Sequence, residues 1–354
     1  MIIKCVSKEF FLTPYWKFYF MAKDLDKITT KVEEMYREYP YPSPSTEASQ
    51  TNELLNLLRI FELENNIKFE NKNFLDAGSG SGHRITNVAL HYKKCNFLGI
   101  DISDSSLKIA NTLKNKNHLQ NIQFKKFNLM NSTSTLGKFD YILCMGVLHH
   151  LSNPVKGLEN ILQSLKKDGM IFLYLYGKLG GHKRMLNKQL ISILLNKEKS
   201  NYDLGIKLVR DLGLNKFEYG WNLNFKNKEE EDSLIVDSLL HANESLYDFN
   251  DLDKLFKKSG LYGFSIFGIT SGTKGFIFDS RTENDEKLSI PQTNISNFLT
   301  SDFSLSHYQS LSIKDKCRVL DLLYEPNGYT IIGFTKQSYE KLNERLKRNF
   351  IKLT

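Results

Sequence analysis

Hydrophobic residues recur along the chain with two spacings, one typical of buried strands and one typical of amphipathic helices. Short apolar runs bounded by turn residues predict strands, and they lie at residues 73–76, 96–101, 122–128, 139–145, 169–177, 261–269 and 329–336. Apolar residues spaced three or four positions apart predict helices, the clearest at residues 51–63, 83–94, 103–116, 153–165 and 247–260. The alternation predicts an α/β fold with a mostly parallel sheet.

The most informative stretch is residues 73–82, NFLDAGSGSG, in which a predicted strand ends at Asp76. Three glycines follow at alternate positions, Gly78, Gly80 and Gly82. A glycine turn between a strand and a helix lets bare backbone approach a ligand. A dinucleotide site needs a third small residue at a fixed spacing, but that position falls on His83 or Ile85. The stretch therefore breaks the dinucleotide fingerprint.

The D-x-G-x-G-x-G pattern beginning at Asp76 resembles the first motif of class I S-adenosylmethionine-dependent methyltransferases. The next predicted strand ends in Asp101, where the family places an acid for the ribose hydroxyls; NAD sites share this acid. The resemblance implies a Rossmann-like, doubly wound, mostly parallel sheet of seven strands, with S-adenosylmethionine as cofactor. The cofactor-binding residues it assigns are Asp76, Ala77, Gly78, Ser79, Gly80 and Gly82 for the methionyl part, Asp101 and Ile102 for the ribose, Asn128 and Leu129 for the adenine, and Met145 at the methyl-transfer cleft.

At Asn128 the sequence departs from the family, which commonly has an acidic residue at this position. The acid contacts the adenine amino group in the family. An asparagine side-chain oxygen can accept the same hydrogen bond, so we expect Asn128 to serve the same purpose.

A second informative stretch, residues 139–151, predicts a buried strand ending around residues 144–146. It is similar to the motif that follows the fourth strand in many class I methyltransferases. Ligands of open α/β sheets lie at such strand ends, so His149 and His150 are candidates for a general base. Tyr176, at the end of the fifth predicted strand, is another candidate. The alternative is an architectural histidine pair, since methyl transfer needs a base only when the nucleophile holds a proton.

Residues 29–45 begin as a helix and end in three prolines at alternate positions. Proline fixes its own φ and favours extended geometry in the preceding residue. We therefore expect a polyproline-like strap from which Tyr39 and Tyr41 project. The strap is either a linker or a lid that places a tyrosine over the cofactor or acceptor, where its ring would attract the sulfonium. The Y-x-x-Y-P-Y-P pattern beginning at Tyr36 is similar to an N-terminal segment in a subset of methyltransferases.

The resemblance covers about residues 70–177, and a helical insertion follows the fifth predicted strand. In the family, elements that cover the substrate commonly occur at this point. At the start of the insertion, His182 and Arg184 flank Lys183. Such a cluster would suit an anionic acceptor, and the alternative is a solvated helix start.

The chain is predicted to divide into a core with an extension and two insertions. The segments are 1–50, an N-terminal extension and strap; 51–177, the S-adenosylmethionine-binding core; 178–246, a helical insertion and substrate cap; 247–269, a core helix and strand; 270–328, a second insertion; and 329–354, the final strand and a C-terminal helix. Met21 opens a polar, helix-compatible stretch, and one hypothesis is that it is the natural start.

Composition narrows the class of protein. The net charge of +8 could indicate a nucleic-acid partner, but the lysines and arginines are spread along the chain, and no nucleic-acid-binding motif is recognisable. The 4 cysteines lack the spacing of a disulfide framework or metal site, and no metal is expected. No run reaches the roughly 18 apolar residues of a membrane span. We expect a cytoplasmic protein with no membrane partner.

The predicted function is methyl transfer from S-adenosylmethionine to a small-molecule acceptor, such as a metabolite or natural-product intermediate. An RNA or protein acceptor is the alternative within the enzyme class, with nucleic acid less favoured. A non-catalytic S-adenosylmethionine-binding partner subunit is the alternative of another class. The sequence does not predict the oligomeric state.

Overall fold

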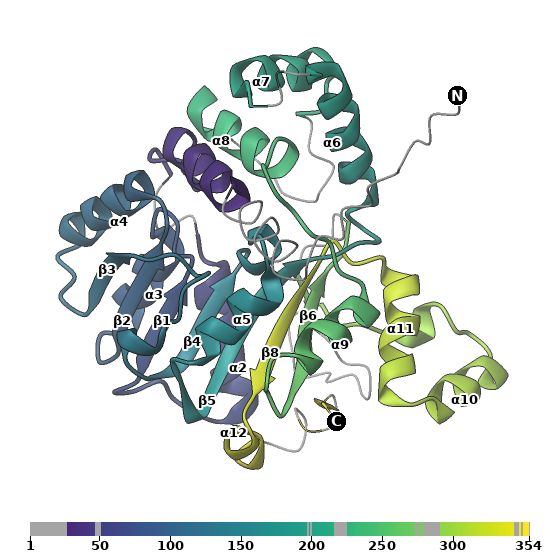
Figure 1. Cartoon of the computed structure of the whole chain (residues 1–354). Coiled ribbons are helices and arrows are strands. Elements are labelled where there is room, and N and C mark those ends of the chain that lie inside the picture. Colours follow the sequence, from purple (N-terminus) through teal and green to yellow (C-terminus); the bar gives the residue numbers. More distant parts are fainter. Residues whose placement is uncertain are drawn as a thin grey trace, which may run out of the picture.

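The computed structural model describes residues 27–46, 51–196, 198, 200–215, 225–272, 276–278, 291–342, 347 and 350–353. In these ranges a central sheet carries helices on its faces, and a group of helices stands at one end of it (Figure 1). The hypothesis of a natural start at Met21 lies outside the described residues. No described helix is long and apolar enough to cross a membrane.

The sheet has nine strands in the described part of the chain. They are β1 Asn73–Ala77, β2 Asn96–Asp101, β3 Ile122–Lys126, β4 Phe139–Met145, β5 Leu165–Tyr176, β6 Gly263–Thr270, β7 Phe276–Phe278, β8 Gly328–Phe334 and β9 Phe350–Lys352. Their order is β3-β2-β1-β4-β5-β8-β6-β7, with β9 also pairing with β6. Strands β3 to β5 are parallel, and β8 runs antiparallel between β5 and β6. The predicted doubly wound, mostly parallel sheet is confirmed.

The strand count exceeds the predicted seven by two short strands, β7 and β9. Both pair with the edge of β6 that does not face β8, at its two ends. An edge strand carries unpaired backbone donors and acceptors, which these segments satisfy. Beyond β8, the described residues include the short helix α12, Lys336–Glu340, the helical residue Lys347 and the strand β9.

Helices connect the strands, and local capping residues fix where several of them begin. Besides α12 and the N-terminal helical residues 27–38, the described helices outside the insertion after β5 are α2 Glu53–Asn65, α3 His83–His91, α4 Asp104–Lys116, α5 Pro154–Leu162, α9 Phe249–Lys257, α10 Asp302–Ser310 and α11 Ile313–Tyr324. Ser103 caps α4 and Asn153 caps α5, each by accepting a backbone N–H bond from the first turn. Asp248 and Asp251 form a capping box at the start of α9.

Helix α5 ends earlier than its apolar spacing predicts. The spacing predicts a helix through residue 165, but the chain is already extended there and Leu165 pairs with Phe139 of β4. The Lys166 ammonium forms an ion pair with Asp140, 2.9 Å away. Strand pairing and this ion pair therefore override the helical spacing.

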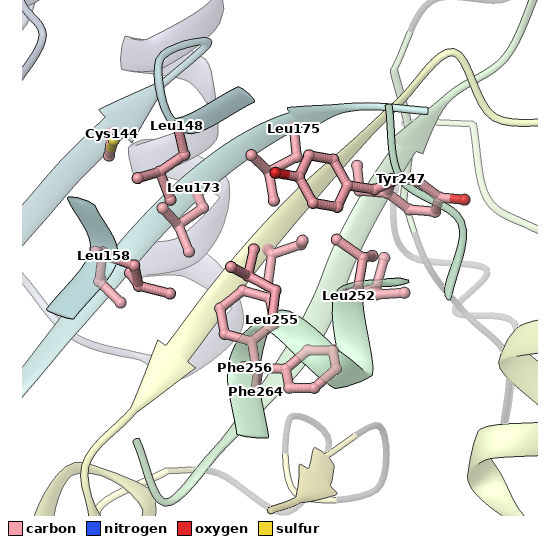
Figure 2. Packing of buried hydrophobic residues seen from close by; sticks show 14 of the residues in the cluster. Cys144, Leu148, Leu158, Leu173, Leu175, Tyr247, Leu252, Leu255, Phe256 and Phe264 are labelled. Carbon is pink, nitrogen blue, oxygen red and sulfur yellow. The ribbon is translucent and has the colours of Figure 1, made fainter. Parts of the chain in front are cut away.

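Both faces of the sheet are buried, which explains the continuous apolar runs of the central strands. In β4, Tyr141 and Leu143 belong to one apolar cluster, whereas Ile142 and Cys144 belong to the other. Successive side chains point to opposite faces of a strand, so the two clusters cover opposite faces. Figure 2 shows the cluster that contains Cys144, which packs beside Leu148 of the turn after β4.

A third apolar cluster lies within the group of helices at the end of the sheet. It joins α6 His182–Leu195, α7 Tyr202–Asp211, α8 Lys228–Leu239 and the N-terminal helical residues 27–38. Its buried members are Met35, Ile191, Leu195, Ile206, Val209, Ile235, Val236 and Leu239. We call these four helical segments the cap bundle. The N-terminal extension and the helical insertion, expected as separate elements, thus share one small core.

Candidate active site

The glycine turn between β1 and α3 has a backbone that only glycine adopts easily. Gly78, Gly80 and Gly82 have φ of 87°, 53° and 77°, in the left-handed region. A Cβ on Gly80 would lie 2.8 Å from the carbonyl oxygen of Tyr41, and one on Gly78 would lie 2.4 Å from Val147. The turn therefore sits between the strap and the segment after β4, with no room for side chains.

Asp101, at the end of β2, faces this turn. Its carboxylate accepts hydrogen bonds from the backbone N–H groups of Gly80, at 2.8 Å, and Ser103, at 2.9 Å. Burial raises the pKa of Asp101, and these bonds oppose that effect. Each carboxylate oxygen can accept a second bond, so the side chain retains capacity for ribose hydroxyls. Ile102, also predicted for the ribose, is the residue between Asp101 and Ser103.

Asp76 and Arg84 place opposite charges at the two ends of the turn. Burial raises the pKa of Asp76 to about 7, while the Arg84 charge lowers it and Asp101 raises it. Arg84 donates to the carbonyl oxygen of Met145, 3.2 Å away. Its charge also interacts with Tyr41 and Asp76. Sequence reasoning missed Arg84, although a cation just after a glycine turn could have indicated it.

The remaining predicted cofactor residues lie along the same edge of the sheet. The Asn128 side-chain oxygen accepts a bond from the Met130 N–H at 2.9 Å, so its second lone pair is the one left for an adenine amino group. The backbone of Leu129, whose side chain is buried, is held by the Asn160 amide. Ala77 is fully buried at the end of β1, and Ser79 donates its backbone N–H to Ile100.

The predicted base candidates come together after β4. His149 and His150 lie in the short helical turn η3, Leu148–His150, and the ring of His149 stacks on Tyr176 with centroids 3.9 Å apart. Both imidazole nitrogens of His149 are buried and have no hydrogen-bond partner among the described residues. Burial holds the pKa of His149 well below its usual value, and His150, Arg184 and Lys188 add to this effect. Burial likewise raises the pKa of Tyr176 well above its usual value.

The strap crosses the glycine turn but does not stay extended as predicted. It bends near residues 39–42 and turns at Ser43, whose carbonyl accepts the Thr46 N–H. The Ser81 hydroxyl donates to the Pro42 carbonyl at 2.8 Å, and the His83 ring lies 2.7 Å from the Thr46 carbonyl. These bonds to the turn compete with the polyproline geometry.

The two strap tyrosines go to different places. Tyr39 donates to Asp203 of α7 at 3.0 Å, and its ring packs against Tyr202, so it joins the cap bundle. Tyr41 lies at the glycine turn, where burial raises the pKa of its hydroxyl, Asp237 adds to this and Arg84 opposes it. The structure therefore places Tyr41, and not Tyr39, among the charges next to the turn.

The predicted basic cluster at the start of α6 does not form a common site. His182 is exposed. Arg184 is buried, forms an ion pair with Glu244, and lies over the Tyr176 ring, 4.9 Å from its centroid. Glu244 also pairs with Lys188 at 2.5 Å. Glu244 is shared by Arg184 and Lys188, so Arg184 is held in this ion-pair group, and its predicted contact with an anionic acceptor stays a prediction.

Sequence reasoning also missed a polar group contributed by the cap bundle. The Tyr36 hydroxyl donates to Asp237 at 2.8 Å and lies 3.2 Å from His241 Nε2. The ring of His241 stacks on His150, with centroids 3.6 Å apart. No local pattern marks these residues, because they meet only through the packing of the cap bundle on the turn after β4.

The comparisons agree with the fold. Residues 68–226 match the family model Methyltransf_31, described as a methyltransferase domain. An uncharacterized Synechococcus protein is 25% identical over 333 residues, covering 87% of this chain and 72% of that protein. The ubiquinone biosynthesis O-methyltransferase of Coxiella burnetii is 29% identical over 123 residues, covering 34% of this chain and 50% of that one.

A solved structure shows the same fold. PKMT2 from Rickettsia typhi, in complex with AdoHcy, has a TM-score of 0.55 and 19% identity, with 82% of this chain and 54% of that chain covered. This chain thus spans about half the length of two of these three relatives. The sheet order, the glycine turn with its flanking acids and the matched domain define a cofactor-binding methyl-transfer fold. Residues 68–226 are a methyltransferase domain, which implies S-adenosylmethionine as methyl donor.

Proposed function

We propose that the chain transfers the methyl group of S-adenosylmethionine to a small-molecule acceptor whose protic nucleophile lies beside His149. The observation that carries this proposal is the environment of the His149 ring. The ring is fully buried, and neither nitrogen has a hydrogen-bond partner among the described residues. Buried polar atoms are almost always hydrogen-bonded, and we infer that a bound acceptor supplies the partner of these atoms.

The neighbouring residues suit the binding of a cofactor and an acceptor. The glycine turn offers bare backbone, Asp101 retains acceptor capacity for the ribose, and Arg84 is the cation next to the turn. Bound S-adenosylmethionine supplies an activated methyl group. The contribution of the chain is to align the nucleophile with that group and to exclude water.

The proposed role of His149 is to take the proton of the nucleophile. Burial keeps its ring neutral, so a nitrogen lone pair can accept a hydrogen bond from a hydroxyl or similar group. During the transfer of the methyl group to the nucleophile, His149 would accept the proton that the nucleophile loses. Tyr176 stacks on the ring and limits its orientation. His150 and Tyr41 are proposed to line the same region.

Two observations support a small molecule as acceptor. The cap bundle and strap bring mainly aromatic and neutralised polar side chains to this region, which suits an enclosed site. In addition, the relative from Coxiella burnetii is a ubiquinone biosynthesis O-methyltransferase, and O-methylation of a small molecule needs a proton acceptor. The test described next distinguishes this proposal from an RNA or protein acceptor and from a non-catalytic role.

The test is transfer of label from methyl-tritiated S-adenosylmethionine into a small-molecule-rich lysate. The proposal predicts solvent-extractable label that survives ribonuclease and protease. Loss of label after either treatment would instead identify RNA or protein as acceptor, and S-adenosylhomocysteine binding without any transfer would favour the non-catalytic role.

Variants then test the residue assignment. His149→Ala should lower kcat by about 10²- to 10⁴-fold, the range of general-base catalysis, with unchanged affinity for S-adenosylhomocysteine. The matched control is His91→Ala, because His91 is exposed at the end of α3. Wild-type kcat in a folded His149→Ala protein would rule out the base role.

A further inference from the structure

Asn243, in the loop after α8, bonds to both of the stacked histidines His150 and His241. Its side-chain amide donates to the carbonyl oxygens of His150, at 3.2 Å, and Leu151, at 3.0 Å. Two residues on, the Ser245 N–H donates to the His149 carbonyl at 2.8 Å. These hydrogen bonds hold the loop of Asn243 and Ser245 against the turn that contains His149, the proposed base.

The backbone carbonyl of Asn243 determines the position of the proton on His150. His150 Nδ1 lies 2.9 Å from this carbonyl oxygen. A carbonyl can only accept a hydrogen bond, so Nδ1 carries the proton. In the neutral ring, Nε2 then holds the lone pair.

The backbone N–H of Asn243 determines the opposite arrangement on His241. This N–H donates to His241 Nδ1 at 3.0 Å, so Nδ1 must hold a lone pair. The proton of the neutral ring is therefore on Nε2, which faces the Tyr36 hydroxyl at 3.2 Å. Since the Tyr36 hydroxyl donates to Asp237 at 2.8 Å, the protons point in one direction, from His241 through Tyr36 to Asp237.

The assignment requires both rings to be neutral, and their surroundings favour this. Burial lowers the pKa of His150, against the effects of Asp237 and the Asn243 carbonyl. Burial also lowers the pKa of His241 well below its usual value, and His150, Lys188 and His149 add to it. Two charged rings stacked 3.6 Å apart would repel strongly.

The tautomer of His241 argues against a metal ion between His150, Asp237 and His241. Ligand atoms of His150, Asp237 and His241 all lie within 4.8 Å of one another. A histidine ligand must offer a nitrogen lone pair, and its other nitrogen normally donates a hydrogen bond. His241 has the reverse arrangement, because its Nδ1 accepts from Asn243 and its Nε2 carries the proton.

We propose that Asn243 is a positioning residue for the methyl transfer proposed above. It fixes the stacked rings of His150 and His241 in opposite tautomers and holds the turn on which His149 lies. The ring centroid of His150 lies 4.2 Å from that of His149 and 5.7 Å from that of Tyr176, and both contacts are edge-on. A fixed His150 ring therefore limits how the His149 ring can turn relative to the acceptor. This inference rests on the proposed function for its catalytic consequence, but the tautomers can be measured without it.

The experiment is ¹⁵N NMR of the full chain with labelled histidine, assigned with His150→Gln and His241→Gln. The expected wild-type spectrum shows His150 protonated on Nδ1 and His241 protonated on Nε2. Asn243→Ala keeps the backbone N–H and carbonyl of residue 243 but removes the two side-chain bonds that hold this loop on the turn. The backbone contacts to both rings should then loosen, which should mix their tautomers and lower kcat at least tenfold, while the affinity for S-adenosylhomocysteine stays within twofold. Asn243→Ser, which keeps one donor, should give intermediate spectra and serves as the test if the alanine variant does not fold.

Asn201→Ala is the matched control, because the Asn201 side chain caps α7 within the cap bundle. It should lower the melting temperature without changing either tautomer or kcat. The proposal is overturned if wild-type His241 carries its proton on Nδ1, if Zn²⁺ shifts the signals of His150 and His241 together, or if folded Asn243→Ala keeps both tautomers. If wild type transfers no methyl group but shows the expected tautomers, the proposed function fails while the positions of the protons stand.

Discussion

Replacing Asp101 with alanine tests the cofactor site most directly. The carboxylate accepts two backbone bonds, from Gly80 at 2.8 Å and Ser103 at 2.9 Å, and we expect it to bind the ribose as well. A hydrogen bond to a charged group contributes about 1.5 to 3 kcal/mol. Losing the ribose contact should therefore weaken the binding of S-adenosylhomocysteine by about 1 to 3 kcal/mol, or roughly 5- to 150-fold.

The same substitution should also lower the stability of the unliganded protein. The N–H groups of Gly80 and Ser103 lose their acceptor, and a buried unsatisfied donor costs about 1 to 3 kcal/mol. We expect a loss of about 2 to 4 kcal/mol in the free energy of unfolding, since water can replace part of the two bonds. Urea unfolding measures this loss, and titration calorimetry measures the affinity.

Asp140→Ala is the matched control. Asp140 accepts a backbone bond from Asn73 at 2.9 Å and pairs with Lys166, but it lies at the start of β4, the opposite end of the parallel strands from the glycine turn. This variant should lose stability and keep its affinity within about twofold. An unchanged dissociation constant in folded Asp101→Ala would refute the assignment of Asp101 to the ribose.

Two further predictions concern buried charges. Because burial raises the pKa of Asp76 to about 7, above its unfolded value of 3.8, the folded state binds the extra proton between these values and stability falls as pH rises through about 7. Asp76→Asn should therefore be more stable than wild type at pH 8, by about 2 to 4 kcal/mol, with a smaller difference at pH 5; equal differences in urea at both pH values would contradict this. Glu244→Ala leaves buried Arg184 and partly exposed Lys188 without their acid and should cost about 3 to 5 kcal/mol. Glu231→Ala, which breaks a more exposed pair with Arg210, should cost clearly less, and similar losses in denaturant would argue against a special role for burial.

Local interactions explain why much of the fold could be predicted. The strand β1, the glycine turn and α3 follow from neighbouring residues, because apolar alternation, left-handed glycines and helix caps act over a few positions. Ser103 and Asn153, the first residues of two predicted helical ranges, cap α4 and α5. The position of Asp101 opposite the turn also follows, since β1 and β2 are adjacent parallel strands that end together.

Predictions failed where a distant contact competed with a local pattern. Leu165, the last residue of a predicted helix, is part of a strand because β4 pairs with β5 there, next to the ion pair between Lys166 and Asp140. The strap bends because Ser81 and His83 bind its backbone. Arg184 lies in a basic stretch that would suit an anionic acceptor, but its guanidinium pairs with Glu244, 60 residues further on.

The sequence by itself determined the class of fold, the cofactor turn and the two histidines after β4, since each is encoded in a short stretch whose geometry is local. Only the tertiary structure decided what surrounds those histidines. Tyr36 meets Asp237 across 201 residues of chain, and no periodicity links residues so far apart. Their meeting depends on the apolar packing of the N-terminal helix with α6, α7 and α8, which is a property of the folded chain as a whole.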